Sequence, residues 1–330
     1  MSSTDVFVFE LASCVNIDLS PGIVVEGLGM FSTLMRDFGS AFSFVRPGIL
    51  EGVSNSYHPQ SWRVEEVNVG LERSYGLFEE FCERSDRVLA IAPEDDMMLC
   101  KFTEIADRYS NLGSDSKAVR VCSDKWEVYR RLKNRIDMPE TSLKPLHKKQ
   151  VVKPRVSCGG SGIVFYSGER HPEHSGNTIY QEFIDGVSLS VSMIAGDDIS
   201  VLSVNEQILD GFEYLGAIIP ARVDESVRRE VIDAATEAAG ALGLRGYCGV
   251  DIVYSDRPYV VDVNARMTTP SIVFFHTYGI NLGELILENY ERGRVEMKEG
   301  ARARRVLLKK GGRGSRLVSF KGAWISLSEF

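Results

Sequence analysis

The sequence CGVDIVYSDRPYVVDVNAR, residues 248–266, is the most informative part of this chain. Two apolar runs flank the turn-forming residues Ser-Asp-Arg-Pro, a pattern that predicts two paired strands joined by a tight turn. Residues i and i+2 of a strand face the same side, so Asp262 and Asn264 project together, and Asp251 joins them if the strands pair. Two carboxylates and an amide oxygen are hard ligands that suit Mg²⁺. The alternative is a pair of acids on the solvent side of a half-exposed hairpin.

Arg266 follows Asn264 by two residues and continues the same face of the predicted strand. A guanidinium beside two acids can form a salt bridge, or it can hold a phosphate or carboxylate group of a ligand. The residues by themselves leave both alternatives open.

A second candidate site lies upstream, where Lys153 ends a predicted strand and the run Ser157-Cys158-Gly159-Gly160-Ser161-Gly162 precedes the next strand. Glycines let backbone N–H groups approach a polyphosphate closely, and a lysine supplies positive charge. The run is not a Walker A loop, because no Gly-Lys-Ser/Thr follows. It is not a dinucleotide fingerprint either, because it precedes a strand rather than a helix. An ordinary hairpin turn is the alternative.

Two further segments stand at the ends of predicted elements. Lys125 begins a predicted helix over residues 124–134, directly after a predicted strand at 118–121. The run Gln181-Glu182-Phe183-Ile184-Asp185-Gly186 ends a strand and turns, which leaves backbone C=O and N–H groups able to meet the edge of a planar base. Taken alone, a surface lysine and an ordinary strand end are the simpler interpretations.

Strands and helices alternate in the first third of the chain. Predicted strands cover residues 6–10, 42–45, 87–92 and 118–121, and predicted helices cover residues 22–38, 65–84 and 96–110. This alternation predicts a parallel sheet covered by helices on both faces, with the loop 92–96 facing a ligand cleft. After residue 150 strands follow one another without a long helix until 227–242, so an antiparallel sheet is expected there.

The composition is that of a folded protein with a large core. The chain has 330 residues, of which 44% are hydrophobic and 25% charged. No apolar run approaches the ~18 residues of a membrane span, and the N-terminus lacks the basic region of a signal peptide. The six cysteines form no C-x-x-C pair, which argues against a zinc cluster and favours a reducing compartment. We therefore expect a cytoplasmic protein with no membrane partner.

The charge distribution bears on partners. A net charge of −8 argues against a nucleic-acid partner. Residues 301–322 nevertheless carry eight Lys or Arg and no acid. We interpret this segment as a solvated basic tail, with contact to an anion or to an acidic face of another subunit as the alternative. His171 and His174 form H-x-x-H in a polar loop, where surface histidines are the better interpretation than a metal site.

These motifs, in this order, resemble the ATP-grasp superfamily of carboxylate–amine ligases. The resemblance runs from about residue 118 to 290, and the α/β start looks like the domain that precedes it in that family. It implies an α/β and α+β fold, with an N-terminal Rossmann-like parallel sheet followed by two α+β lobes that clamp ATP. The implied domains are the N-terminal domain (1–115), the small lobe with the glycine-rich loop (116–184), and the large lobe with the metal site and basic C-terminal segment (185–330).

The resemblance also implies cofactors and roles. The cofactors are ATP and Mg²⁺ or Mn²⁺, and the metal ligands are Asp251, Asp262 and Asn264. The implied catalytic residues are Arg266, which steadies an acyl phosphate, and Lys153. The backbone of Glu182 and Ile184 meets the adenine edge, and the loop 157–162 closes over the phosphates. The residues implied to bind ATP are Lys125, Lys153, Ser157, Gly159, Gly160, Ser161, Gly162, Glu182, Phe183, Ile184 and Asp185.

Two positions depart from the family's pattern. Ser188 stands where a ribose-binding glutamate is common, which leaves Asp185 or Ser188 itself for that contact. Asp262 stands where a metal-binding glutamate is more common, and it keeps the charge on a shorter side chain.

The opening of the chain suggests a substrate class. Glu10, the run GIVVEGLGMF and the run APEDD are similar to the tyramine–glutamate ligases of methanofuran biosynthesis, as is GVSLSVS after the hinge. This similarity implies small-molecule substrates: glutamate, activated as an acyl phosphate with release of ADP, and an aromatic amine. Glu26 and residues 92–96 are expected on the substrate side. A ligase of the lysine–methylornithine type and a non-catalytic nucleotide-binding regulator are the alternatives, and the sequence leaves open whether the chain forms a homo-oligomer.

Overall fold

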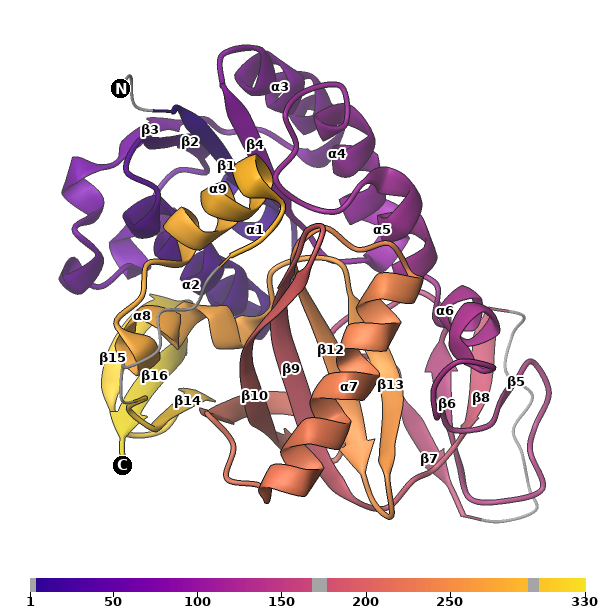
Figure 1. Cartoon of the computed structure of the whole chain (residues 1–330). Helices are drawn as coiled ribbons and strands as arrows, with labels where there is room; N and C mark the ends of the chain where they lie inside the picture. Colours follow the sequence, from indigo (N-terminus) through magenta and orange to yellow (C-terminus); the bar gives the residue numbers. More distant parts are fainter. Residues whose placement is uncertain (1–3, 168–176, 296–302) are drawn as a thin grey trace.

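Three β-sheets form the framework of the protein (Figure 1). The structure is a computed structural model that describes residues 4–167, 177–295 and 303–330. The first sheet has the order β3-β2-β1-β4, and every neighbouring pair is parallel, which confirms the predicted parallel sheet. Its strands are β1 (Val6–Glu10), β2 (Ala41–Val45), β3 (Arg63–Glu66) and β4 (Arg87–Ile91). The helices of this part are α1 (Leu11–Cys14), α2 (Pro21–Asp37), α3 (Leu71–Glu83) and α4 (Met98–Ala106), with 3₁₀ turns at Ile49–Gly52, Asn55–Tyr57, Pro59–Ser61 and Asp95–Met97.

Helices cover both faces of this sheet because the side chains of β1 alternate between them. On one face, the ring centroid of Phe9 lies 4.9 Å from that of Phe78 in α3 and 4.4 Å from that of Phe102 in α4. On the other face, Gly27 of α2 packs against Glu10, and a Cβ atom on Gly27 would lie 2.4 Å from the Glu10 Oε1 atom. Glycine is therefore what lets α2 approach the end of β1.

One predicted strand of the first third is wrong. Residues 118–121 lie in helix α5 (Ser116–Cys122), where the Asp115 carboxylate accepts a hydrogen bond from the Ala118 N–H at 2.8 Å. This N-terminal cap outweighs the strand preference of the two valines. The fourth strand of the sheet is instead β3, an edge strand whose residues are mostly exposed, so its sequence shows no apolar run.

The second sheet has the order β13-β12-β9-β10-β11-β14-β16-β15 and is antiparallel throughout. The predicted hairpin and antiparallel sheet are confirmed, although β11 was not predicted. Helix α7 (Glu225–Ala241) packs across it. The strands are β9 (Val187–Ala195), β10 (Ile199–Asp210), β11 (Glu213–Ile219), β12 (Gly246–Tyr254), β13 (Pro258–Asn264), β14 (Val306–Lys310), β15 (Ser315–Phe320) and β16 (Ala323–Glu329). A 3₁₀ turn (Thr269–Val273), α8 (Phe274–Tyr278) and α9 (Leu282–Arg292) follow β13.

The interpretation of residues 301–322 as a solvated tail is wrong for the described part of that segment. Strands β14 and β15 belong to the second sheet, and the side chains of Val306, Leu308 and Val318 are buried in it. The apolar residues of the segment complete a core, while most of its basic side chains remain on the surface.

The third sheet is a small antiparallel one with the order β5-β8-β6-β7. The glycine-rich run 157–162 connects β6 to β7, and helix α6 (Lys125–Leu132) contacts β5. The strands are β5 (Thr141–Ser142), β6 (Gln150–Pro154), β7 (Val164–Tyr166) and β8 (Thr178–Glu182).

Helix α2 connects the first sheet with the C-terminal strands. It contacts β1 and β2 as well as β15 and β16. At its end, Asp37 accepts a hydrogen bond of 3.1 Å from the Leu282 N–H, at the start of α9. The domain boundaries after residues 115 and 184 stay predictions. Within the described ranges, none of the helices has the length and apolar character needed to cross a membrane.

Candidate active site

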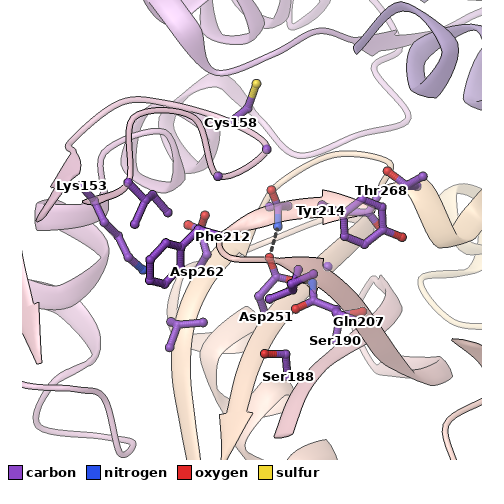
Figure 2. Close-up of a pocket in the computed structure, with 18 of the residues that line it drawn as sticks. Lys153, Cys158, Ser188, Ser190, Gln207, Phe212, Tyr214, Asp251, Asp262 and Thr268 are labelled. Atoms are coloured by element: carbon purple, nitrogen blue, oxygen red, sulfur yellow. Dashed lines mark hydrogen bonds between the residues drawn. The ribbon is translucent and has the colours of Figure 1, made fainter. Parts of the chain in front are cut away.

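A cavity of about 390 Å³ is lined by residues from all three sheets (Figure 2). It brings together most of the predicted site residues from separate parts of the sequence. Those that line it are Lys153, Gly159, Gly160, Glu182, Phe183, Ile184, Asp185, Asp251, Asp262, Asn264 and Arg266. The predicted site residues that are not among the lining residues are Lys125, Ser157, Ser161 and Gly162.

The hairpin β12–β13 places its acids side by side. Asp251 is the register partner of Asp262, and the Asn264 Nδ2 atom donates to the Asp251 Oδ2 atom at 3.5 Å. The Gln207 side chain of β10 donates to the other Asp251 oxygen at 3.0 Å. Burial, followed by the charge of Asp262, raises the pKa of Asp251 to about 7. The carboxyl group of Asp251 therefore loses its proton more readily when a positive charge lies close to the pair.

This donor set fits a hard divalent cation. Two carboxylates and one amide are oxygen donors of the kind that Mg²⁺ accepts while it keeps water and phosphate oxygens in its other positions. In the part of the chain that the structure describes, no group of three or more His, Cys, Asp or Glu gathers as a metal site, so the third donor here is the amide of Asn264. His171 and His174 lie outside the described residues.

The two predicted phosphate-binding lysines are arranged differently. Lys153 lines the cavity, and burial lowers its pKa to about 8 although the charge of Asp262 opposes that shift. Lys125 does not line the cavity: its Nζ atom donates to the Ser157 carbonyl at 2.8 Å and is 3.5 Å from Asp262 Oδ2. Lys153 is therefore the lysine exposed to the cavity, and Lys125 ties the glycine-rich loop to the acidic pair.

The glycine-rich loop contacts another hairpin of the protein. Gly160 has φ of +80°, and a Cβ atom there would lie 2.1 Å from the carbonyl oxygen of Phe212, in the turn between β10 and β11. At Gly159, which has φ of +63°, a Cβ atom would meet nothing within 4 Å. The Cys158 Sγ atom donates to Asp95 at 2.9 Å. The loop is thus held by a close backbone approach that an ordinary hairpin turn does not need.

The end of β8 offers an unpaired backbone donor. The Glu182 N–H donates to the Glu140 carbonyl at 2.8 Å, and the Phe183 N–H donates to the Lys149 carbonyl at 3.0 Å. The next N–H, of Ile184, has no hydrogen-bond partner among the residues that the structure describes. Such a donor on a cavity wall suits the edge of a planar base. Asp185 and Ser188, the two predicted alternatives for a ribose contact, both line the cavity.

Arg266 forms an ion pair with a residue from the loop that follows β4. Its Nε and Nη2 atoms donate to the two carboxylate oxygens of Glu94, each at 2.8 Å, and its Nη1 atom donates to the Met267 carbonyl at 3.0 Å. Both side chains of the ion pair are largely buried. The salt bridge of Arg266 is thus with Glu94 and not with the predicted pair Asp251 and Asp262, and its contact with an acyl phosphate stays a prediction. Sequence reasoning placed the loop 92–96 at the cleft but did not single out Glu94.

A second group of polar residues lies where α2 meets the C-terminal strands. Glu26 lines the cavity, and its two carboxylate oxygens are each 2.5 Å from a partner: Lys310 Nζ on β14 and Thr269 Oγ1. Tyr214 of β11 also lines the cavity, and its buried hydroxyl has no hydrogen-bond partner in the described ranges. Sequence reasoning expected Glu26 on the substrate side and missed Tyr214 and Lys310.

Comparisons with known proteins bear on the fold and the family of the chain. The sequence model of the ATP-grasp domain matches residues 122–270. A tyramine–L-glutamate ligase from Methanocaldococcus fervens is 32% identical over 286 residues, which make up 84% of this chain and 91% of that protein. A D-alanine–D-alanine ligase from Thermotoga maritima is 27% identical over 198 residues, 52% of this chain and 65% of its own. A solved structure from Archaeoglobus fulgidus, described as an ATP-grasp superfamily protein, covers 99% of this chain with a TM-score of 0.84 and 37% identity, and all of that chain is matched. The predicted fold class is confirmed.

Proposed function

The chain belongs to the ATP-grasp family and is an ATP-dependent ligase that forms C–N bonds, and on this premise we propose that it joins L-glutamate to tyramine as γ-glutamyltyramine. The observation that carries the proposal is the similarity to the tyramine–L-glutamate ligase, because the 286 matched residues extend well beyond the domain at 122–270. The similarity therefore includes residues outside the nucleotide-binding part, where a substrate would be recognised.

We assign the adenine to the end of β8 and the phosphates to the region between Lys153 and the β12–β13 hairpin. The unpaired Ile184 N–H supports the first assignment, and the buried Lys153, which lines the same cavity as Asp262, supports the second. Asp251, Asp262 and Asn264 would hold Mg²⁺, which when bound withdraws charge from the phosphate oxygens. Lys125 would act through the loop, since it donates to the Ser157 carbonyl.

The reaction has two steps in this proposal. First, an oxygen of the γ-carboxylate attacks the γ-phosphorus of ATP, the bond to the leaving oxygen of ADP breaks, and a γ-glutamyl phosphate forms. Then the neutral amine of tyramine attacks the carbonyl carbon, the bond to the phosphate oxygen breaks, and inorganic phosphate leaves with the electron pair and can accept the amine's proton. The protein needs no nucleophile of its own, because positioning and charge neutralisation supply the catalysis.

The test is nucleotide and product analysis after incubation of the purified protein with Mg·ATP, L-glutamate and tyramine. We expect ADP and an amide with the mass of γ-glutamyltyramine only when both substrates are present. AMP in place of ADP would overturn the acyl-phosphate route. ADP that forms only with a different acid or amine would keep the ligase and replace its substrates.

A further inference from the structure

The C-terminal strands bring a positive charge next to Glu26, a residue that lines the cavity. Lys310 is the last residue of β14, which pairs with β11. Its Nζ atom lies 2.5 Å from Glu26 Oε1 and 5.7 Å from the ring centroid of Tyr214. It is also close to the start of α2, where a Cβ atom on Gly22 would lie 3.9 Å from it. Lys310 is not among the residues that line the cavity, but it contacts Glu26 and lies near the ring of Tyr214, which both line it.

Glu26 and Lys310 make a fixed pair of opposite charges. The Thr269 hydroxyl donates to the second oxygen of Glu26 at 2.5 Å, which holds the carboxylate in one orientation. The side chains of Glu26 and Lys310 are 18% and 17% exposed, so both are mostly withdrawn from solvent and neither is sealed off. Lys310 keeps donors beyond the one that it gives to Glu26, since an ammonium carries three.

One substrate of the proposed reaction matches this pair better than the other. When the γ-carboxyl of glutamate reacts, its α-ammonium and α-carboxylate stay charged throughout and need partners of opposite charge in a cavity of low dielectric. The amine of tyramine must lose its charge in order to attack, and its phenol is neutral, so it offers no second charge to a lysine. A carboxylate and an ammonium held side by side are complementary to a zwitterion.

Resting on the proposed function, we propose that Glu26 and Lys310 form the site for the α-amino-acid group, with Glu26 holding the ammonium and Lys310 the carboxylate. The acid is then oriented with its side-chain carboxylate toward Asp251 and Asp262, and ligation occurs at the γ rather than the α position. Tyr214 lines the same cavity, and its ring centroid is 5.7 Å from the Lys310 Nζ atom. Its unpartnered hydroxyl provides a further hydrogen bond for the same substrate.

The test compares three acids that share the reacting carboxyl: L-glutamate, glutarate, which lacks the α-amine, and 4-aminobutyrate, which lacks the α-carboxylate. We expect the wild type to prefer L-glutamate to both in kcat/KM. Lys310→Met should lower kcat/KM for L-glutamate about 10- to 100-fold, the effect of losing one charged hydrogen bond, and leave 4-aminobutyrate unchanged. Glu26→Gln should remove the preference for L-glutamate over glutarate and keep the preference for L-glutamate over 4-aminobutyrate.

The controls separate recognition from a structural role. Lys309→Met changes the neighbouring residue of the same strand, on its opposite face, and should keep every preference. Lys310→Arg should restore part of the preference for L-glutamate, because a guanidinium also binds carboxylate. An equal loss for all three acids, or a loss seen only in the KM for tyramine, would overturn the proposal.

The outcome can be told apart from failure of the proposed function. If the wild type forms no ADP with L-glutamate and tyramine, the substrate pair is wrong. The amino-acid site is then tested by calorimetric titration of L-glutamate and glutarate in the presence of Mg²⁺ and a non-hydrolysable ATP analogue. Tighter binding of L-glutamate that Lys310→Met abolishes supports the site, and equal or undetectable binding of the two acids overturns it.

Discussion

Two groups of charges in the same cavity are balanced in different ways. At the metal end, which comprises Asp251, Asp262 and Asn264, two carboxylates are register partners and the nearest cation contact, from Lys125 to Asp262, is 3.5 Å long. At the α2 end, which comprises Glu26, Thr269 and Lys310, one carboxylate meets one ammonium at 2.5 Å. In the proposed function a bound cation balances the first group, whereas the second already pairs opposite charges and is proposed to bind a ligand that carries both.

The largest expected effect comes from removing one charge at the metal end. Asp262→Asn keeps the shape of the side chain but halves the negative charge available to a cation. We expect kcat to fall about a hundred- to a thousandfold, as for loss of a group that stabilises transition-state charge. Asp256→Asn is the matched control, since Asp256 lies in the turn of the same hairpin and should tolerate the change. Equal activity of the two variants would contradict the metal assignment.

The second prediction concerns the stability that the ion pair between Glu94 and Arg266 gives to the fold. Glu94, in the loop after β4, and Arg266, two residues after the end of β13, form a buried ion pair. Glu94→Gln leaves the Arg266 charge buried and uncompensated, so the free energy of unfolding should fall by about 3–5 kcal/mol. Glu104→Gln removes an exposed ion pair with Arg120 and should cost less than about 1 kcal/mol. Chemical denaturation measures the free energy of unfolding of both variants. Similar losses would contradict a larger contribution from the buried pair than from the exposed one.

The affinity of Asp251, Asp262 and Asn264 for Mg²⁺ should depend on pH. Asp251 has a pKa of about 7 in the metal-free protein, so below that pH a proton competes with the cation for its oxygen. Affinity for Mg²⁺ should rise about fivefold from pH 6 to pH 7 and about tenfold from pH 6 to pH 8, and then level off, because Asp251 is by then largely ionised. Titrations with Mg²⁺ at each pH measure this, and Asp251→Asn should flatten the profile. A flat wild-type profile would place the cation elsewhere.

A smaller effect is expected in the glycine-rich loop, which we expect to close over ATP. Gly160→Ala and Gly159→Ala share the strain of a positive φ, but only the Gly160 substitution forces a Cβ atom against the Phe212 carbonyl. The KM for ATP should rise about three- to tenfold more for Gly160→Ala. Limited proteolysis of the loop should be slowed by Mg·ATP in the wild type and in Gly159→Ala. Equal cleavage with and without Mg·ATP would contradict closure.

The local parts of the site could be predicted from the sequence, because the spacing of residues along a strand determines the face on which each side chain lies. The alternation within β13 and the turn before it were enough to bring Asp251, Asp262 and Asn264 together. The wrong strand at 118–121 also has a local cause, since a capping aspartate outweighed two valines.

The long-range parts could not be predicted, since they depend on how separate elements pack. Glu94 and Arg266 are 172 positions apart in the sequence. The contact between Glu26 and Lys310 requires β14 to join the edge of a sheet, and the basic composition of the segment concealed its apolar positions. Sequence reasoning therefore brought Asp251, Asp262 and Asn264 together, and it missed Lys310.

The most direct test of the central claim is the fate of oxygen in the acid substrate. L-Glutamate labelled with ¹⁸O in the γ-carboxylate is incubated with the protein, Mg·ATP and tyramine, and the released phosphate is analysed by mass spectrometry. The account predicts one ¹⁸O atom in each phosphate from the γ-labelled acid and none from the α-labelled acid. Label that appears in AMP, or phosphate labelled only from the α-carboxylate, would contradict it.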